Sequence, residues 1–198
     1  MRRLILARHG ESEYSARGLL SGDATAKVPL TATGAEQARQ LGRFVADEPL
    51  DLCVTSELAR TRATAELALA GRAVPIEAWP DLNDPRAGRF EGRSLVEYRR
   101  WAWSAGSREA APGGGESRLA AVGRYTRAYR TLLDRPEETV LAIVHALPIA
   151  YVLFALEGKP PAARMDRPIE YAHPYFLTAE GVGAALDVLE SWSREPTW

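Results

Sequence analysis

The chain has 198 residues, 46% of them apolar and 26% charged, which is ordinary for a globular domain with a sizeable core. Its 25 basic and 26 acidic residues give a net charge of −1, so no overall field attracts nucleic acid or a membrane surface. A single cysteine excludes an internal disulfide and suits a reducing cytoplasm. The apolar run after Arg2 and Arg3 is too short for a signal peptide, and no run is long enough to span a membrane. We expect one cytoplasmic domain over residues 1–198, with a loose tail at 191–198.

The first predicted strand ends at Arg8-His9-Gly10. Its apolar run is short, contains the β-branched Ile5 and is closed by a glycine, which is typical of a buried strand. Open α/β sheets bind ligands at the carboxyl ends of their strands. An arginine there offers a planar charged fork suited to phosphate, and a histidine offers a nitrogen that titrates near neutrality. Taken alone, the three residues also fit a strand end with a solvated arginine–histidine pair.

The stretch after this strand lacks clean periodicity and predicts a long functional loop over residues 11–32. A capping-box spacing at residues 33–36 then predicts a helix that ends by Pro49. Residues 50–55 predict a strand that buries Cys53 in the core. A catalytic thiol is the alternative there, but nothing around Cys53 is electropositive.

A second helix is predicted from Ser56, which can cap it, to about Gly71. Arg60 falls in its first turn, where the helix dipole disfavours a cation. A bound phosphate would resolve that conflict, because anions bind at helix N-termini. Arg60 is therefore a candidate phosphate ligand.

The remaining elements continue the alternation of strands and helices. We predict a strand at 75–82, helices at 94–104 and 117–133, a strand at 139–144 followed by His145 and a helix with Pro148 in its first turn, and a terminal hairpin of strands 175–178 and 184–189. The triplet Gly113-Gly114-Gly115 lacks the lysine of a phosphate-binding loop and predicts a flexible connection. Such alternation predicts an α/β fold, with a mostly parallel sheet between two helical layers that the hairpin makes mixed.

Five motifs along the chain, from Leu4 to about Leu156, resemble those of the histidine phosphatase superfamily, the phosphoglycerate-mutase-like enzymes. They are Arg8-His9-Gly10-Glu11-Ser12; Pro29-Leu30-Thr31 with Gly34, Gln37 and Ala38; Ser56-Glu57-Leu58-Ala59-Arg60-Thr61 with Thr64-Ala65; Leu82-Asn83-Asp84 followed by Gly88 and Phe90-Glu91-Gly92; and Val144-His145-Ala146. One such motif is a weak signal, but five in the same order are a strong one. The resemblance implies a three-layer α/β/α sandwich of the phosphoglycerate-mutase-like type.

The resemblance also implies a phosphatase that hydrolyses a phosphate monoester without a metal or cofactor. His9 would form a phosphohistidine, while Arg8, Arg60 and His145 would hold the phosphoryl oxygens. Asp84 would protonate the leaving oxygen and then activate water. Further phosphate contacts are implied for Ser15, Ser21 and Gly22.

The chain departs from the family pattern at the implied proton donor, because Asp84 stands where glutamate is usual. Glu91 is the competing candidate, although its Phe-Glu-Gly setting matches a mostly structural position. Ala146 replaces a usual glycine, and Ser15 and Ser21 stand where asparagine and glutamine are frequent. These departures bear on the substrate and the rate more than on the fold.

A small phosphorylated metabolite is the expected substrate, with no nucleic-acid or membrane partner, and a homodimer stays open. Residues 86–116, rich in arginine, are expected to be an insertion that sets substrate specificity. Three alternatives remain: a phosphoglycerate-mutase-type phosphotransferase, a phosphoprotein phosphatase, and a catalytically silent module that binds a phosphorylated ligand. The third is disfavoured because binding alone would not need His9 beside two arginines and His145.

Overall fold

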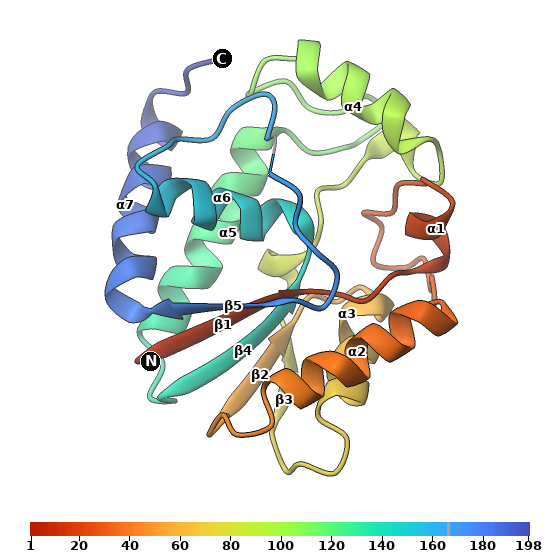
Figure 1. The fold of residues 1–198 in the computed structure, drawn as a ribbon. Helices are drawn as coiled ribbons and strands as arrows, with labels where there is room; N and C mark the ends of the chain where they lie inside the picture. Colours follow the sequence, from red (N-terminus) through yellow and green to blue (C-terminus); the bar gives the residue numbers. More distant parts are fainter. Residues whose placement is uncertain (166) are drawn as a thin grey trace.

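The computed structural model describes residues 1–165 and 167–198. Within that part of the chain, five strands form one mixed sheet of order β3-β2-β4-β1-β5 (Figure 1). The strands are β1 Arg3–Arg8, β2 Leu52–Thr55, β3 Ile76–Ala78, β4 Thr139–Val144 and β5 Pro174–Thr178. The first four are mutually parallel along the sheet, and β5 runs antiparallel to β1 at one edge. The expected α/β fold with a mostly parallel, mixed sheet is confirmed.

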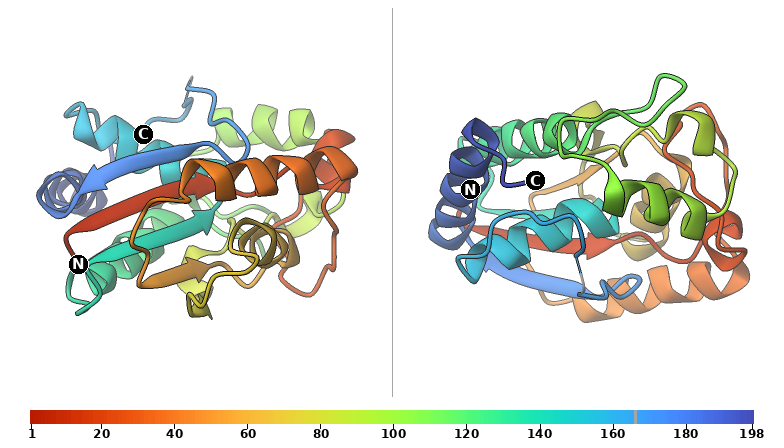
Figure 2. Two further views of the ribbon diagram at one scale, coloured as in Figure 1. Left: turned by 60° about the horizontal axis from the view of Figure 1, so that its bottom comes forward. Right: turned by 90° about the horizontal axis from the view of Figure 1, so that it is seen from above.

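Helices cover both faces of the sheet, which Figure 2 shows nearly edge-on between them. The helices are α1 Glu13–Ala16, α2 Ala32–Phe44, α3 Ala59–Ala68, α4 Leu95–Ser104, α5 Arg118–Leu133, α6 Ala146–Leu156 and α7 Ala179–Arg194. One face packs on α2 and α3, and the other packs on α5, α6 and α7. Alternate residues of β1 point to opposite faces, so Ile5 and Ala7 join one core while Leu4 and Leu6 join the other. No helix in the described ranges is long and apolar enough to cross a membrane.

A third, smaller apolar cluster lies beside α4, away from the sheet. Phe90 packs against Tyr98 and Trp101 with ring centroids 5.7 and 5.6 Å apart. This cluster seats α4 near the carboxyl end of the sheet, as Figure 1 shows. The segment predicted to set specificity therefore has its own small core.

Several predicted bounds are wrong in detail. The helix α2 is capped by Thr31, whose hydroxyl accepts the Gly34 amide, and not by the predicted box at Thr33; it ends at Phe44. The predicted loop at 11–32 contains the one-turn helix α1, which Ser12 caps. The strand predicted at 75–82 is limited to β3, and a 3₁₀ turn at Pro80–Leu82 follows it.

The terminal hairpin is wrong, because its second arm is the helix α7. Two glycines near 181 suggested a turn, but the Gly181 amide donates to Thr178 Oγ1 in the first turn of the helix. Buried residues at Val182, Ala185, Leu186, Leu189 and Trp192 have helical spacing. The predicted tail starts inside this helix, which ends at Arg194, and the final carbonyl at Trp198 accepts the Ser107 amide.

Candidate active site

Three adjacent parallel strands end side by side and supply the polar residues of the candidate site. β1 and β4 are in register from Arg3 and Thr139 to Arg8 and Val144, so His9 and His145 directly follow paired residues. The His9 amide extends that ladder by donating to the Val144 carbonyl over 3.0 Å. Sheet register therefore places the two imidazoles together, with ring centroids 5.3 Å apart.

The backbone around Gly10 fixes His9 in a single tautomer. His9 Nδ1 lies 2.7 Å from the Gly10 carbonyl, which can only accept, so Nδ1 carries the proton. Nε2 is then a free base, and the Arg60 Nε donates to it over 3.0 Å. A Cβ on Gly10 would lie 2.3 Å from the Gly34 carbonyl, so only glycine allows this close approach. The imidazole thus presents an unprotonated nitrogen to the cavity.

The His9 imidazole is held in its neutral form. It is 4% exposed, and burial together with the charges of Arg60 and Arg8 lowers its pKa well below 6.5. The hydrogen bond to the Gly10 carbonyl acts in the opposite sense but is a smaller effect. A neutral imidazole is the form that can attack phosphorus.

Arg60, the second residue of α3, is the hub of the site. Its side chain is 5% exposed, and its Nη2 contacts the Ser21 carbonyl at 2.9 Å, His145 Nδ1 at 3.1 Å and Asp84 Oδ2 at 3.2 Å. Its own backbone carbonyl accepts the Thr64 hydroxyl, which also accepts the Gly10 amide. One arginine therefore ties the nucleophile candidate, the second histidine and the carboxylate together.

His145 is a neutral hydrogen-bonding group here. Its Nδ1 faces Arg60, which can only donate, so Nδ1 accepts and Nε2–H donates to Ser56 Oγ over 2.8 Å. Burial, followed by the charge of Arg60, lowers the pKa of this fully buried imidazole well below 6.5. In this geometry His145 hydrogen-bonds to Arg60 and Ser56 as a neutral group.

The Asp84 carboxyl is positioned by contacts of the preceding residue, Asn83. The Asn83 carbonyl accepts from Arg124 at 2.9 Å and from the Tyr125 hydroxyl at 3.1 Å, and the Asn83 side chain pairs with Glu57. Asp84 keeps 24% of its side-chain surface, which faces the cavity. Burial raises the pKa of this carboxyl above 3.8, against the lowering effect of the Arg60 charge. A raised pKa suits a group that must donate a proton.

Glu91, the competing carboxylate, accepts hydrogen bonds from two backbone amides. Its two oxygens accept the Gly22 and Ala87 amides at 2.9 and 2.8 Å. Glu91 is not one of the described residues that line the cavity. This arrangement favours a structural role.

Of the other predicted phosphate ligands, Arg8, Ser15 and Ser21 line the cavity and Gly22 does not. Arg8 lines the cavity, where it stacks on the Tyr171 ring, 3.7 Å from its centroid, and donates to the Ile169 carbonyl. Ser15 and Ser21 also line the cavity, although the Ser15 hydroxyl is bonded to the backbone of Ser12.

Gly22 is different, because it is not among the described lining residues. Its amide is committed to Glu91, and a Cβ on it would lie 2.1 Å from the Pro85 carbonyl. Its position suits close packing of two loops rather than a phosphate contact.

Cys53 is fully buried, and burial raises the pKa of its thiol to about 12, as expected of a core residue.

The predicted site residues Arg8, His9, Arg60 and Asp84 line one cavity of about 630 Å³. We call Arg8, His9, Arg60 and Asp84 its floor. Tyr98, Arg99 and Trp103 of α4 with Arg118 of α5 form what we call its helical wall. The cavity is also lined by residues from the segment before β5, namely Ala163, Met165, Arg167, Pro168, Ile169 and Tyr171.

Sequence reasoning missed the wall residues Tyr98 and Arg118 and the stacking partner Tyr171. Arg118 carried a usable signal, because it follows the capping Ser117 in a first helical turn, where a cation opposes the dipole as at Arg60. Across the described residues, no group of three or more His, Cys, Asp or Glu side chains is arranged to hold a metal ion.

Comparison with known proteins gives a consistent picture. The model of the histidine phosphatase superfamily (branch 1) matches residues 4–191. An adenosylcobalamin/alpha-ribazole phosphatase from Salmonella typhimurium is 32% identical, covering 96% of this chain and 93% of that protein. A 2,3-bisphosphoglycerate-dependent phosphoglycerate mutase from Methylobacterium radiotolerans is 31% identical, covering 96% of each. The crystal structure of an alpha-ribazole phosphatase from Shigella flexneri superposes with a TM-score of 0.76 at 31% identity, covering 88% of this chain and 89% of that one.

Proposed function

The chain belongs to the histidine phosphatase superfamily and is a phosphatase, and we propose that it hydrolyses the phosphate monoester of a small metabolite through a phosphohistidine on His9. One observation carries this proposal. His9 Nε2 is unprotonated, and Arg60 reaches both that nitrogen and the Asp84 carboxyl, with contacts of 3.0 and 3.2 Å. A nucleophile, a phosphate clamp and a proton donor thus converge on one point.

In the first step, the lone pair of His9 Nε2 attacks phosphorus as the bond to the leaving oxygen breaks. Arg8 and Arg60 hold the equatorial oxygens, because permanently charged guanidinium groups stabilise their negative charge without accepting a proton. The protonated Asp84 carboxyl gives its proton to the leaving oxygen. The products of this step are the free alcohol and N-phosphohistidine, with the Nδ1 proton still bound to the Gly10 carbonyl.

In the second step, water attacks the phosphohistidine from the side that the alcohol has left. Asp84, now a carboxylate, takes a proton from the water as the P–N bond breaks, so its starting state is regenerated. The electron pair of that bond returns to His9 Nε2, and inorganic phosphate leaves. His145 is neutral in this mechanism, and its Nδ1 holds Arg60 in place by accepting a hydrogen bond from Nη2 over 3.1 Å.

The substrate class follows from the cavity and from the relatives. A volume of about 630 Å³ accommodates a phosphorylated metabolite well beyond phosphate itself. Residues 86–116 supply Tyr98, Arg99 and Trp103 to the wall, which supports the proposal that this segment sets specificity. The same proposal places the protein in the cytoplasm. Its substrate would be a free metabolite, and it would bind neither nucleic acid nor a membrane.

A mutase-type phosphotransferase is the second candidate, because a relative of the same identity level is a phosphoglycerate mutase. The two activities differ in what accepts the phosphoryl group from His9. A phosphatase gives it to water, whereas a mutase returns it to an organic hydroxyl.

A substrate screen on the purified protein tests the proposal. The panel should include alpha-ribazole 5′-phosphate, 3-phosphoglycerate, sugar phosphates and a phosphopeptide, with release of inorganic phosphate as the readout. We expect turnover of at least one metabolite and loss of the phosphoenzyme to water even when 3-phosphoglycerate is present. Transfer to 3-phosphoglycerate in preference to water would establish the mutase, and turnover of the phosphopeptide alone would contradict a metabolite substrate.

A further inference from the structure

Arg118 is a charged residue in the helical wall that the proposed reaction does not use. It is the first residue of α5, which Ser117 caps. Its Nη1 donates to the Tyr151 hydroxyl over 3.1 Å. Its Nε is buried and, among residues 1–165 and 167–198, has no hydrogen-bond partner. The positive end of the helix dipole lies beside the same cation, so an additional anion there would be favourable.

Arg124, on the same helix, shows how this chain stabilises a buried arginine that is structural. Its Nε and Nη2 bind both carboxylate oxygens of Glu116 at 3.1 and 2.8 Å. Its Nη1 donates to the carbonyls of Asp81 and Asn83. The Arg118 guanidinium has no carboxylate within ion-pair distance in the described ranges. The two arginines are therefore built for different purposes.

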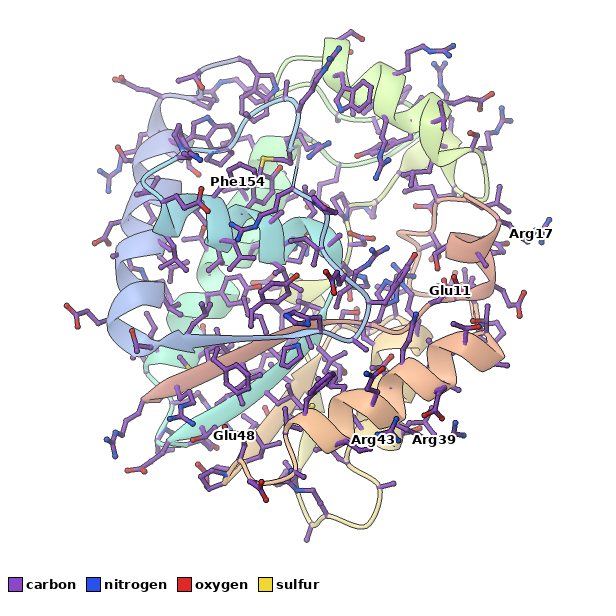
Figure 3. All side chains as sticks on the ribbon, viewed as in Figure 1. Glu11, Arg17, Arg39, Arg43, Glu48 and Phe154 are labelled. Atoms are coloured by element: carbon purple, nitrogen blue, oxygen red, sulfur yellow. The ribbon has the colours of Figure 1, made fainter. Side chains whose placement is uncertain are left out.

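Two arginines on the exterior of α2 are also paired. Arg39 and Arg43 extend from the outward side of α2, as Figure 3 shows, and both contact Glu36, at 3.2 and 2.8 Å. An exposed arginine would tolerate the loss of such a partner because water solvates it. The buried Nε of Arg118 lacks that solvent, so its missing partner is the more informative observation.

The charged groups that line the cavity leave a positive surplus. Of the described lining residues, five are arginines and one, Asp84, is a carboxylic acid. The arginines are Arg8, Arg60, Arg99, Arg118 and Arg167. The first two serve the transferred phosphoryl group, and Arg167 is paired with Glu157 at 2.7 Å. Arg99 is close enough to add to burial in lowering the pKa of Arg8. Two wall arginines thus remain for a second anion.

We propose that Arg118 and Arg99 form a second anion-binding subsite, so that the preferred substrate carries a carboxylate or a second phosphate besides the group that His9 attacks. The inference rests on the proposed function and specifies its substrate class. Guanidinium groups bind both kinds of anion through charge-assisted, often bidentate hydrogen bonds. Tyr98, 8% exposed, directly precedes Arg99 on α4, lines the same wall and adds a hydroxyl to it.

Matched pairs of substrates test this subsite. 3-Phosphoglycerate carries a carboxylate where glycerol 3-phosphate carries a hydroxymethyl group. Fructose 1,6-bisphosphate and fructose 6-phosphate differ by one phosphate at longer range. The ratio of kcat/KM within each pair is measured for the wild type, Arg118→Leu, Arg118→Lys and the control Arg130→Leu. Arg130 lies on the same helix but pairs with Asp187 and Glu190 on α7, outside the cavity.

We expect the wild type to favour the more anionic member of at least one pair, and Arg118→Leu to reduce that preference by about ten- to hundredfold, mainly through KM. Arg118→Lys should restore part of it, and Arg130→Leu should leave it unchanged. A preference that is absent from the wild type, or that survives Arg118→Leu, would overturn the subsite.

The subsite and the proposed function fail in different ways. A phosphoenzyme on His9 without charge selectivity would refute the subsite and leave the phosphatase intact. Absence of both turnover and phosphoenzyme would refute the proposed function. In that case, calorimetric binding of the same pairs to His9→Ala still decides whether Arg118 recognises a second anion.

Discussion

The floor and the helical wall of the cavity differ in how firmly their central side chains are held. On the floor, His9 and Arg60, like the adjoining His145, are each fixed by at least two hydrogen bonds. The floor residue Arg8 is the exception, because it donates only to the Ile169 carbonyl and has a buried Nε without a partner among the described residues. On the wall, Arg118 donates to the Tyr151 hydroxyl, and its buried Nε has no hydrogen-bond partner among the residues described. Fixed groups suit a reaction whose transition state is always the same. Groups left open suit recognition, so the floor sets the chemistry and the wall sets the substrate.

The largest effect is expected on the floor. His9→Ala should lower kcat on the order of 10⁴–10⁶-fold, because the attacking nitrogen is lost while the phosphate clamp remains. His173→Ala is the matched control, since that histidine is exposed and lies outside the described cavity lining. Steady-state kinetics and circular dichroism of both variants provide the measurement. Equal activity of His9→Ala and the control would remove His9 from the reaction.

Asp84→Asn should give the next largest effect. Loss of the proton donor should slow phosphorylation by alkyl phosphates about 10²–10⁴-fold, and by aryl phosphates with acidic leaving groups much less. Burst kinetics separate this step from dephosphorylation, which the same variant should slow for both substrates. Glu91→Gln is the control. If Glu91→Gln shows the leaving-group dependence and Asp84→Asn does not, the assignment of the donor is wrong.

Within α5, stability separates a structural arginine from a recognition arginine. Arg124→Met leaves the Glu116 carboxylate, 7% exposed, without its partner and should lower the free energy of unfolding by about 3–5 kcal/mol. Arg118→Leu should lower it by about 1 kcal/mol or less, since only the Tyr151 hydroxyl loses a bond. Urea unfolding of the two variants measures the difference. A larger loss for Arg118→Leu would make that residue structural.

The pH dependence should report a neutral nucleophile and a protonated donor. Burial, aided by Arg60 and Arg8, lowers the pKa of His9 well below 6.5, so His9 stays unprotonated as the pH falls through 6.5. Burial raises the pKa of Asp84 above 3.8, so its proton persists to a higher pH and is lost as the pH rises. We expect kcat/KM to decline on the alkaline side only, after correction for the substrate phosphate, whose second pKa is about 6. Asp84→Asn should remove that decline. An acid limb centred at 6.5 would contradict the lowered pKa of His9.

The smallest effect is expected from chelation. Arginine charges and one carboxyl perform the stabilisation and proton transfer, and no metal-ligand cluster occurs in the part of the chain described. Activity after prolonged dialysis against EDTA should equal that of an untreated sample. Loss that Mg²⁺ or Mn²⁺ restores would contradict the proposed chemistry.

The sequence pointed to individual residues of the floor but only to the segment 86–116 for the wall, for a physical reason. His9 and His145 follow apolar runs that can only be buried strands, and parallel strands bring their ends together. Arg60 stood out because a cation opposes the dipole at the start of a helix. These signals are local, so they predicted the class of fold and singled out His9 and Arg60. The roles of Asp84 and His145 beside them came from the resemblance to the histidine phosphatase superfamily.

The partners of the floor residue Arg8 and of the wall residue Arg118 lie on distant segments. Tyr171 meets Arg8, and Tyr151 meets Arg118, only because tertiary packing brings α6 and the segment before β5 to the cavity. No spacing in the sequence encodes those meetings. The error at α7 has a different origin, because Gly181 and Gly183 suggested a turn although the apolar spacing was helical.

Trapping of the phosphoenzyme tests the central claim most directly. The enzyme is mixed with a ³²P-labelled substrate, quenched within milliseconds, and digested so that mass spectrometry locates the phosphoryl group. The account predicts a label on His9 that is lost in acid and survives alkali, as a phosphoimidazole does, and that is absent from His9→Ala. A label that survives acid, or one on any other residue, would contradict the account.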